Sequence, residues 1–304
     1  MNTDDKTKSI IDYYSKFEEQ NRLKSAYGQL EFAHMTEILE RYFPKPPAKI
    51  CDIGGAAGDY TIHFAENGYD VHLLDIVPLH IENALGKKNI NTDNFIVGDA
   101  LNLPYEDNSF DAVFLGGPLY HLPERKDRIK ALREARRVLK PNGIITAYGI
   151  GRYATMFYGI DSGKIFEDTF MEQLKTEVST GHRHRYENNH AVLDNAFFHL
   201  SEELKQEVLD AGLNFIALHG VIGNGWMAPN FDEAWKTDHF RNSILKIARM
   251  SENIPDACSK IFIAAKKQVN IRCFSYTNFI EIKPRSYINN CAALFYCVCC
   301  IIKF

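Results

Sequence analysis

The chain has 304 residues, 45% hydrophobic residues and a formal net charge of −4, which is typical of a globular protein with a substantial core. This acidic balance disfavours a dedicated nucleic-acid-binding protein, because such proteins normally have a basic excess or stripe. The charged opening stretch does not resemble a signal peptide, and no run approaches the ~20 apolar residues of a membrane span. We therefore expect a cytoplasmic protein without a membrane segment.

Two helices are predicted within residues 9–43. Apolar residues recur at helical spacing, first from Ile10 to Phe17 and then from Leu30 to Leu39. The following "FPKPPAK" ends the second helix, because proline cannot continue it. We assign residues 1–45 to an N-terminal helical segment.

From residue 46, short apolar strands alternate with helical patterns. The predicted strands are "KICDI", "YDVHLLDI", "NFIVGD", "FDAVFLGG" and "GIITAYGI". The helix before the fifth strand, "ERKDRIKALREARRVLK", is strongly amphipathic. This alternation predicts an α/β fold with a doubly wound, mostly parallel sheet and helices on both faces.

The pattern changes after the fifth strand. Residues 152–198 give mixed helix and loop signals with no clear strand, and we interpret them as an insert. A helix that Ser201 caps and Gly212 closes follows, then a strand at "NFIALHGVIG", a helix over 231–252 and a strand at "KIFIAAKK". These elements complete a domain over residues 46–267.

The last stretch, residues 268–304, does not continue this pattern. It holds five of the seven cysteines, but "CVCC" lacks the paired spacing of a zinc site, and a disulfide framework is not expected in a cytosolic enzyme. We assign it as an atypical cysteine-rich tail of unknown role, either an accessory element or foreign coding sequence.

The stretch "ICDIGGAAGDY" lies at the first strand-to-helix turn. Its glycines, Gly54, Gly55 and Gly58, let ligand atoms approach the backbone, and the helix that follows offers unpaired N–H groups. The dinucleotide fingerprint G-x-G-x-x-G fits poorly, whereas acidic-x-G-x-G-x-G fits from Asp52 with Ala56 as one substitution. The alternative is a tight turn whose small residues only permit packing.

Two carboxylates follow at the next strand ends. Asp75 closes the second strand, where it can accept hydrogen bonds from both hydroxyls of a ribose. Asp99 and Ala100 follow the third strand, where a carboxylate and a backbone N–H can bind the edge of an adenine. Either aspartate alone could be a turn residue. Together, at consecutive strand ends, they predict a pocket for an adenosine group.

These motifs resemble the class I S-adenosylmethionine-dependent methyltransferases, in the broad group called methyltransferase type 11. The resemblance covers about residues 10–267 and is closest in "DIGGAAG", "LLD", "GDALNLPYEDNSFDAVFLGGPLYHL", "ALREARRVLKPNGIITAYGI" and "AFFHLSEELKQEVLDAGLNFIAL". It implies a Rossmann-like sheet of seven strands whose last strand is inserted antiparallel. It also implies S-adenosyl-L-methionine as cofactor and S-adenosyl-L-homocysteine as product.

The resemblance also implies residue roles. The glycine loop would meet the methionine part of the cofactor, Asp52 would orient its amino group, and the residue after the ribose-binding aspartate would lie against adenine. The N-terminal helices would form a lid, and the insert over residues 152–198 would shape the substrate site. Arg22 of the lid would lie near the methionine carboxylate; the alternative is an exposed arginine. Ala56 replaces a usual glycine, and we expect less loop freedom rather than lost binding. The implied cofactor-binding residues are Tyr14, Arg22, Asp52, Gly54, Gly55, Ala56, Gly58, Asp75, Ile76, Asp99, Ala100 and Gly116.

Candidate catalytic residues come from "GGPLYHL". Tyr120 or His121 would orient or deprotonate the acceptor, because histidine is the natural base near neutral pH; the alternative is that both are structural. Metal binding is not expected, since no histidine pair among His182, His184, His190 and His199 has the geometry of a zinc helix.

The acceptor is open at this point. A small molecule, methylated on N or O by direct displacement, is favoured by the acidic balance and by the lack of an Asn/Asp-Pro-Pro-Tyr motif. An RNA or protein acceptor, or a cofactor-binding module without turnover, remains an alternative, and a nicotinamide-dependent dehydrogenase fails on glycine spacing. The oligomeric state is not predicted.

Overall fold

A computed structural model describes residues 3–15, 19–87, 91–184 and 195–268 of the chain. These residues belong to one compact unit, Met1–Val269. The predicted cysteine-rich tail, apart from Gln268, lies outside the described residues, as does His190 of the insert. The account below concerns this unit.

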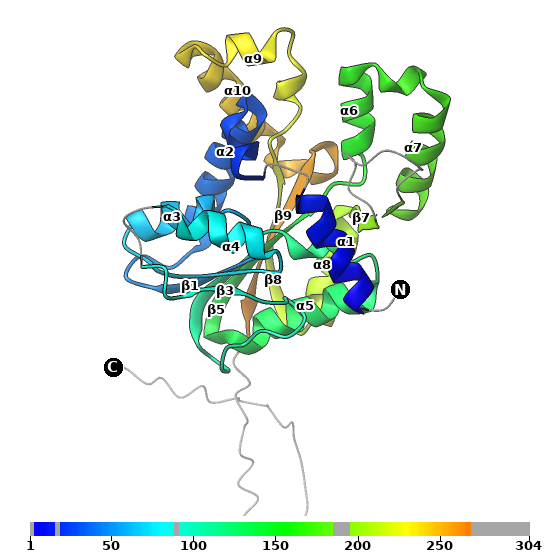
Figure 1. The fold of residues 1–304 in the computed structure, drawn as a ribbon. Helices are drawn as coiled ribbons and strands as arrows, with labels where there is room; N and C mark the ends of the chain where they lie inside the picture. Colours follow the sequence, from blue (N-terminus) through cyan, green and yellow to red (C-terminus); the bar gives the residue numbers. More distant parts are fainter. Residues whose placement is uncertain (1–2, 16–18, 88–90, 185–194, 269–304) are drawn as a thin grey trace, which may run out of the picture. The chain divides into compact units, whose positions relative to one another are not determined.

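A sheet of seven strands forms the centre of the unit (Figure 1). Its order is β3-β2-β1-β4-β5-β9-β8, with parallel pairing from β3 to β5 and antiparallel pairing of β9 with both β5 and β8. The strands are β1 (Lys49–Ile53), β2 (Asp70–Asp75), β3 (Phe95–Val97), β4 (Phe110–Leu115), β5 (Leu139–Ile150), β8 (Leu213–Val221) and β9 (Lys260–Lys267). The predicted doubly wound fold with an antiparallel last strand is confirmed.

Helices bury both faces of the sheet. Apolar residues of one face pack with α5 and α8, and those of the other pack with α2, α3 and α10, because successive side chains of a strand point to opposite faces. A smaller cluster places α4 against β2 and β3. The bounds are α2 (Ala26–Tyr42), α3 (Asp59–Glu66), α4 (Pro78–Leu85), α5 (Arg125–Val138), α8 (Ser201–Asp210) and α10 (Asp238–Met250).

The N-terminal segment has one more element than predicted. Helix α1 (Thr3–Ser15) is followed by the 3-10 helix η1 (Glu19–Lys24), and α2 then begins where Ser25 accepts a hydrogen bond from the Gly28 N–H at 3.0 Å. The 3-10 helix η1 has too few residues to show a helical period. It lies at the carboxyl ends of the strands, where Glu19 and Arg22 line the pocket described below.

The insert after β5 contains a strand pair that periodicity did not predict. Its elements are α6 (Ala154–Ser162), η3 (Lys164–Phe166), α7 (Asp168–Thr180), β6 (His182–Arg183) and β7 (Ala196–Phe197). The prediction of no strand is wrong, because two-residue strands are too short for alternation to be visible. Arg152 fixes the two ends of the insert by donating to the Phe198 carbonyl at 2.8 Å and to Glu203 at 2.7 Å.

Two helix boundaries also differ from prediction. Leu200, not Ser201, is the N-cap of α8, since the Glu203 carboxylate accepts from the Leu200 N–H at 2.8 Å. The predicted helix over 231–252 is divided into α9 (Phe231–Ala234) and α10. The remaining 3-10 turns are η2 (Pro118–His121), η4 (Gly225–Met227), η5 (Ser251–Asn253) and η6 (Pro255–Ala257).

Candidate functional site

The site lies where the strand order reverses, between β1 and β4. In doubly wound sheets, the loops on the two sides of such a point diverge and leave a crevice at the carboxyl ends of the strands. Here the loop after β1 forms one wall and the loop after β4 forms the other. Loops after β2 and β3, together with α1 and η1, complete the lining.

The loop after β1 depends on its small residues. Gly54 has a φ of +71°, and a Cβ there would lie 2.6 Å from the Pro118 ring, so the two walls of the crevice approach closely. Ala56 also lies in the left-handed region, with a φ of +51°. Because an L-residue with a side chain is strained in that region, this supports the expectation that the loop is stiffer than its glycine counterpart.

Asp52, at the end of β1, lies directly beneath this loop. Its Oδ2 accepts from the Thr61 hydroxyl at 2.7 Å, while its buried Oδ1 has no hydrogen-bond partner among the described residues. A Cβ on Gly55 would lie 2.5 Å from the carboxylate. Burial raises the pKa of Asp52 to about 7. The site therefore holds a carboxyl group that lacks the partner that its ionised form requires.

Asp52→Asn should raise the free energy of unfolding at pH 8. The folded-state pKa exceeds the unfolded one, so the folded chain binds more protons, and stability falls as pH rises from about 4 to about 7. The asparagine amide would keep an acceptor for Thr61 and remove this penalty, which we expect to amount to roughly 2–4 kcal/mol. Urea unfolding of both proteins at pH 5 and pH 8 measures it. A gain that is equal at both pH values would contradict the assignment.

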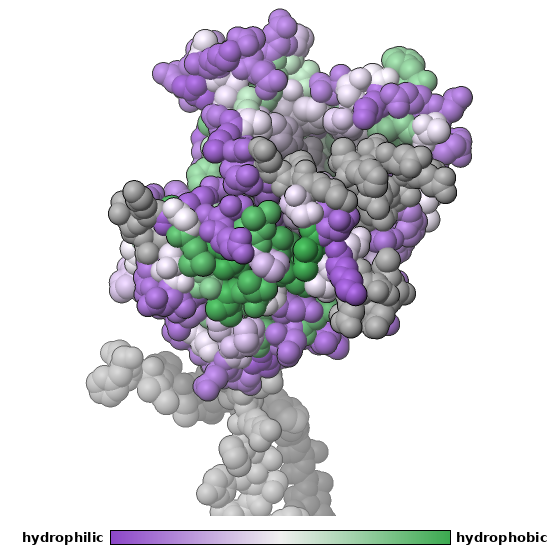
Figure 2. All heavy atoms as spheres, in the orientation of Figure 1, coloured by the Kyte–Doolittle hydropathy of each residue, from purple (hydrophilic) through white to green (hydrophobic). Residues whose placement is uncertain are grey.

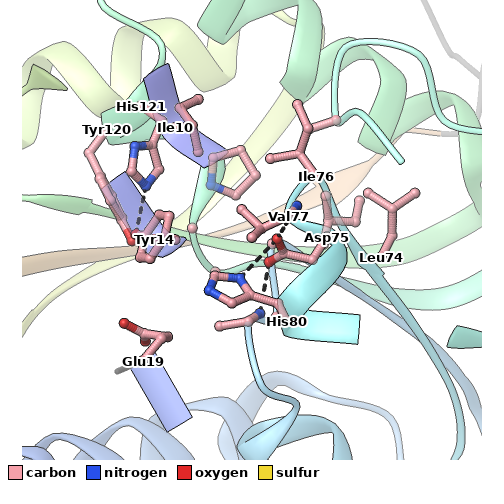
Figure 3. Close-up of a pocket in the computed structure, with 18 of the residues that line it drawn as sticks. Ile10, Tyr14, Glu19, Leu74, Asp75, Ile76, Val77, His80, Tyr120 and His121 are labelled. Atoms are coloured by element: carbon pink, nitrogen blue, oxygen red, sulfur yellow. Dashed lines mark hydrogen bonds and ion pairs between the residues drawn. The ribbon is translucent and has the colours of Figure 1, made fainter. Parts of the chain in front are cut away.

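Asp75, at the end of β2, binds three groups that shape the pocket. Its Oδ2 accepts from the Ala56 N–H at 2.9 Å, and its Oδ1 accepts from the Val77 N–H at 2.9 Å and contacts His80 Nδ1 at 3.0 Å (Figure 3). A carboxylate offers about four acceptor positions. One position is therefore left for a ligand, fewer than the two that the ribose prediction requires.

His80, one turn into α4, was not predicted. Its ring is buried and lines the pocket, and its Nε2 has no hydrogen-bond partner among the described residues. In the neutral tautomer whose Nδ1–H donates to Asp75, Nε2 can accept a hydrogen bond. The sequence signal was its position in the first turn after the aspartate.

Four more of the candidate residues lie in the loops after β2, β3 and β4. Ile76, Asp99, Ala100 and Gly116 all line the pocket. Asp99 Oδ1 accepts from the Leu101 N–H at 2.8 Å, so this carboxylate also closes a turn. Asp52 and Gly58 are the predicted residues that do not line the pocket; they position the loop from beneath.

Tyr14 of α1 reaches across the pocket to the opposite wall. Its hydroxyl lies 2.9 Å from His121 Nε2, and its ring meets the His80 ring edge-on at 4.7 Å between centroids. Figure 3 shows Tyr14 between the two histidines. Burial lowers the pKa of His121 to about 4 and raises that of Tyr120 to about 12. His121 is therefore neutral at pH 7.

Arg22 belongs to a buried cluster of charges at the inner end of the pocket. It donates to Glu31 at 2.7 Å and to Glu19 at 2.5 Å, and Lys260 donates to the other oxygen of Glu31 at 2.6 Å. The Arg22 side chain is 27% exposed, so the alternative of an exposed arginine is wrong. With Nε and Nη1 engaged, its other terminal nitrogen remains for a further acceptor.

The pocket is narrow in this conformation. Its volume is about 90 Å³, below the roughly 300–1,000 Å³ of sites for drug-sized ligands. An apolar area lies between α4 and α1 on the face drawn in Figure 2, in line with the many apolar residues of the lining. A nucleoside-sized ligand therefore requires α1 and its Tyr14 to move.

Sequence patterns missed several lining residues. They sit within helices or strands where periodicity assigns them only to a buried face. Tyr60 lines the pocket and has a buried hydroxyl without a hydrogen-bond partner in the described part of the chain, a feature that no sequence pattern indicates. The missed polar residues of the pocket are Glu19, Tyr60, His80 and Tyr148.

A second, larger cavity adjoins the charge cluster. Its volume is about 920 Å³, and residues of α6, α7, η4 and α9 line it. Figure 1 shows the insert helices α6 and α7 facing α9. Lys260 and Tyr27 line its inner end. The Lys260 ammonium lies 4.6 Å from the ring centroid of Tyr148, which lines the first pocket. The two cavities thus meet at Lys260 and Tyr148.

Within the described ranges, no group of three or more His, Cys, Asp or Glu residues could hold a metal ion. His182 and His184 are stacked at 6.2 Å between centroids, and the buried His199 contacts Glu207 at 3.3 Å. These histidines are thus accounted for by contacts within the insert and with α8.

Known proteins match the part of the chain that contains the pocket loops after β1 to β4. Residues 51–147 match the family model of a methyltransferase domain. The chain is 41% identical to a demethylmenaquinone methyltransferase of Staphylococcus haemolyticus over 36% of this chain and 46% of that protein. It is 27% identical to a ubiquinone/menaquinone biosynthesis C-methyltransferase of Rickettsia akari, over 60% of this chain and 75% of that one. Several such matches span less than half of the relative's length.

Solved structures agree on the fold. A SAM-dependent methyltransferase from Methanosarcina mazei superposes with a TM-score of 0.54 at 19% identity, covering 76% of this chain and 97% of that one. A possible histamine N-methyltransferase from Thermotoga maritima gives 0.53 at 17% identity, covering 85% and 98%. At these identities the likeness concerns architecture alone.

Proposed function

The chain belongs to the class I S-adenosylmethionine-dependent methyltransferases of the type 11 group, and we propose that it transfers a methyl group to a small-molecule acceptor. The observation that supports this best is the convergence of the loops after four neighbouring strands on one pocket at the switch point of the sheet. When bound, S-adenosylmethionine supplies an electrophilic methyl group on a sulfonium. The protein then has to hold the cofactor, align the acceptor and exclude water.

Residues in and beneath the pocket suit the parts of this cofactor. Asp52 lies beneath the lining, and its unpartnered Oδ1 suits a cationic amino group, directly or through water. The remaining nitrogen of Arg22 suits a carboxylate. Asp75 would accept from the ribose, Ile76 would pack against adenine, and the loops at Asp99 and Gly116 would border the remaining ligand. The predicted N-terminal lid is supported by the position of Tyr14 across the pocket.

His80 would bind the second ribose hydroxyl. Asp75 retains one acceptor position, and the partnerless Nε2 of His80 lies in the same pocket. His80→Phe keeps a ring against Tyr14 but removes that acceptor. We expect the Kd for S-adenosylhomocysteine to rise about 5–10-fold, in line with one neutral hydrogen bond. Calorimetry measures it, and an unchanged Kd would assign His80 to packing alone.

Tyr120 and His121 would orient the acceptor. A proton must leave an N–H or O–H acceptor as the new bond to carbon forms, and a neutral imidazole can accept it. However, a base with a pKa near 4 is weak at pH 7, which favours an orienting role. We expect His121→Ala to lower kcat about 10-fold at saturating cofactor, with the pH profile unshifted. A loss that appears only at high pH, or an unchanged kcat, would contradict this.

A small-molecule acceptor is supported by the second cavity, whose volume of about 920 Å³ suits a ligand of that size. We retain N or O as the methylated atom; the name of the Rickettsia akari relative, a C-methyltransferase, makes carbon the first alternative. RNA, protein or a non-catalytic role remains a further alternative. No described helix is long and apolar enough to cross a membrane, and a cytoplasmic location is part of this proposal.

Transfer of labelled methyl from S-adenosylmethionine to a metabolite extract, with mass identification of the product, tests the function directly. Calorimetry with S-adenosylhomocysteine and with NAD separates it from dehydrogenase chemistry. Binding of S-adenosylhomocysteine without labelled product would favour the alternative of a cofactor-binding module without turnover. Lack of binding would overturn the proposal.

A further inference from the structure

The large cavity has an aromatic interior. Seven aromatic side chains line it, and Tyr27 and Trp226 meet edge-on at 5.5 Å between ring centroids. Flat rings of this kind favour a planar, apolar ligand through offset and edge-on contacts. The aromatic lining residues are Tyr13, Tyr27, Tyr158, Phe170, Phe198, Trp226 and Phe231.

Hydrogen-bond donors stand among these rings. The Trp226 indole N–H is buried and has no acceptor among the described residues. Arg183, whose side chain is 16% exposed, lies over the Phe198 ring at 5.3 Å, and its buried Nε likewise lacks an acceptor in bonding geometry among those residues. Lys260, 13% exposed, adds an ammonium at the inner end. The interior thus offers donors with few matching acceptors.

The carboxylates that balance these cations lie outside the lining. Glu177, 3.0 Å from Arg183 Nε, and Glu31, bound to Lys260, are fully buried and do not face the cavity. The acidic residues that do line it, Asp161, Asp232 and Glu233, lie toward solvent, where water and salt screen them. A ligand inside therefore meets the cationic donors directly, while Glu177 and Glu31 lie behind those donors and solvent screens the carboxylates of the lining.

We propose that this cavity, as the acceptor site of the methyl transfer proposed above, takes an aromatic acceptor bearing a carboxylate. The ring packs among the tyrosines, Phe198 and Trp226, and the carboxylate receives hydrogen bonds from Arg183 or Lys260. Guanidinium and ammonium groups form their strongest bonds with ionised oxygen, so a neutral amide of the same shape binds more weakly. An ammonium in that place is repelled.

Three probes of similar shape test this on the full chain saturated with S-adenosylhomocysteine: 1-naphthoate, 1-naphthamide and 1-naphthylmethylamine. Calorimetry should give a Kd for the carboxylate at least about 10-fold below that of the amide, with the amine weakest. Quenching of tryptophan fluorescence, lost in Trp226→Phe, should locate the probe. Equal affinities, a preference for the amine or quenching that persists in Trp226→Phe would each overturn the proposal.

Variants assign the preference to one side chain. Arg183→Gln should reduce the carboxylate-to-amide ratio about 10-fold, and Arg183→Lys should retain most of it. Lys164→Gln, which removes a cation at the cavity's margin whose ammonium lies over the Tyr158 ring, is the matched control and should leave the ratio within about 2-fold. An unchanged ratio in Arg183→Gln would overturn the assignment. Binding of S-adenosylhomocysteine, measured alone, reports separately on the proposed function.

Discussion

Asp75→Ala is expected to raise the Kd for S-adenosylhomocysteine about 100-fold. The carboxylate binds the Ala56 and Val77 N–H groups and His80, so its loss releases the loop after β1 and the start of α4 together. It also removes the proposed ribose acceptor. One charge-assisted hydrogen bond to the ribose at about 1.5 kcal/mol, and about as much for the released loop, account for this magnitude. Calorimetry on the purified variant measures it.

The control is a second aspartate of the same strand. Asp70 begins β2 and is exposed, so Asp70→Ala should leave the Kd unchanged. The thermal midpoint of Asp75→Ala has to be measured beside its affinity, since loosened loops also reduce stability. An affinity within about 3-fold of the parent, in a folded variant, would remove the basis for the adenosine pocket.

Glu31→Ala is expected to lower the free energy of unfolding by about 3–5 kcal/mol. Glu31 is fully buried and accepts from Arg22 and Lys260 on its two oxygens, so alanine leaves two buried cations without that partner. Urea unfolding measures the loss. Glu172→Ala on α7, which removes an exposed pair with Lys175, is the matched control and should leave stability nearly unchanged.

Glu31 also makes the free energy of unfolding depend on pH. Burial raises the pKa of Glu31, but Arg22 and Lys260 outweigh that effect and hold it at about 2, below the value of 4.5 for a free glutamate. Its contribution is therefore complete above about pH 4.5 and is lost as pH falls toward 2. The difference between parent and Glu31→Ala should shrink over that range. A difference that is constant from about pH 6 to about pH 3 would contradict the assignment.

The sheet and its loops could be predicted because they depend on local patterns. Apolar strands, the glycines after β1 and the aspartates at 75 and 99 are each recognisable within a few residues, and topology then brings them to one edge. The elements that prediction missed were short. Strands β6 and β7 have two residues each and the 3-10 helix η1 has six, which is too little sequence for any period to appear.

The charge cluster and the large cavity could not be predicted for a different reason. Glu31 and Lys260 are 229 positions apart, and nothing near either residue identifies the other. His80 and Tyr60 have helical neighbours on both sides. The hydrophobic pattern of the sequence therefore places them on a buried helix face but does not indicate that this face borders the pocket. Such residues become visible only through an unpartnered atom in a folded pocket.

The antiparallel course of β9 has a consequence for how the protein is made. Because β9 runs against β5, its first residue, Lys260, pairs with Ile150 at the edge where the parallel strands finish. Lys260 thus leaves the ribosome 229 residues after Glu31, its partner on α2. Nascent chains halted before β9 should hold Glu31 with Arg22 but without Lys260, so the charge cluster is completed only when β9 joins the sheet.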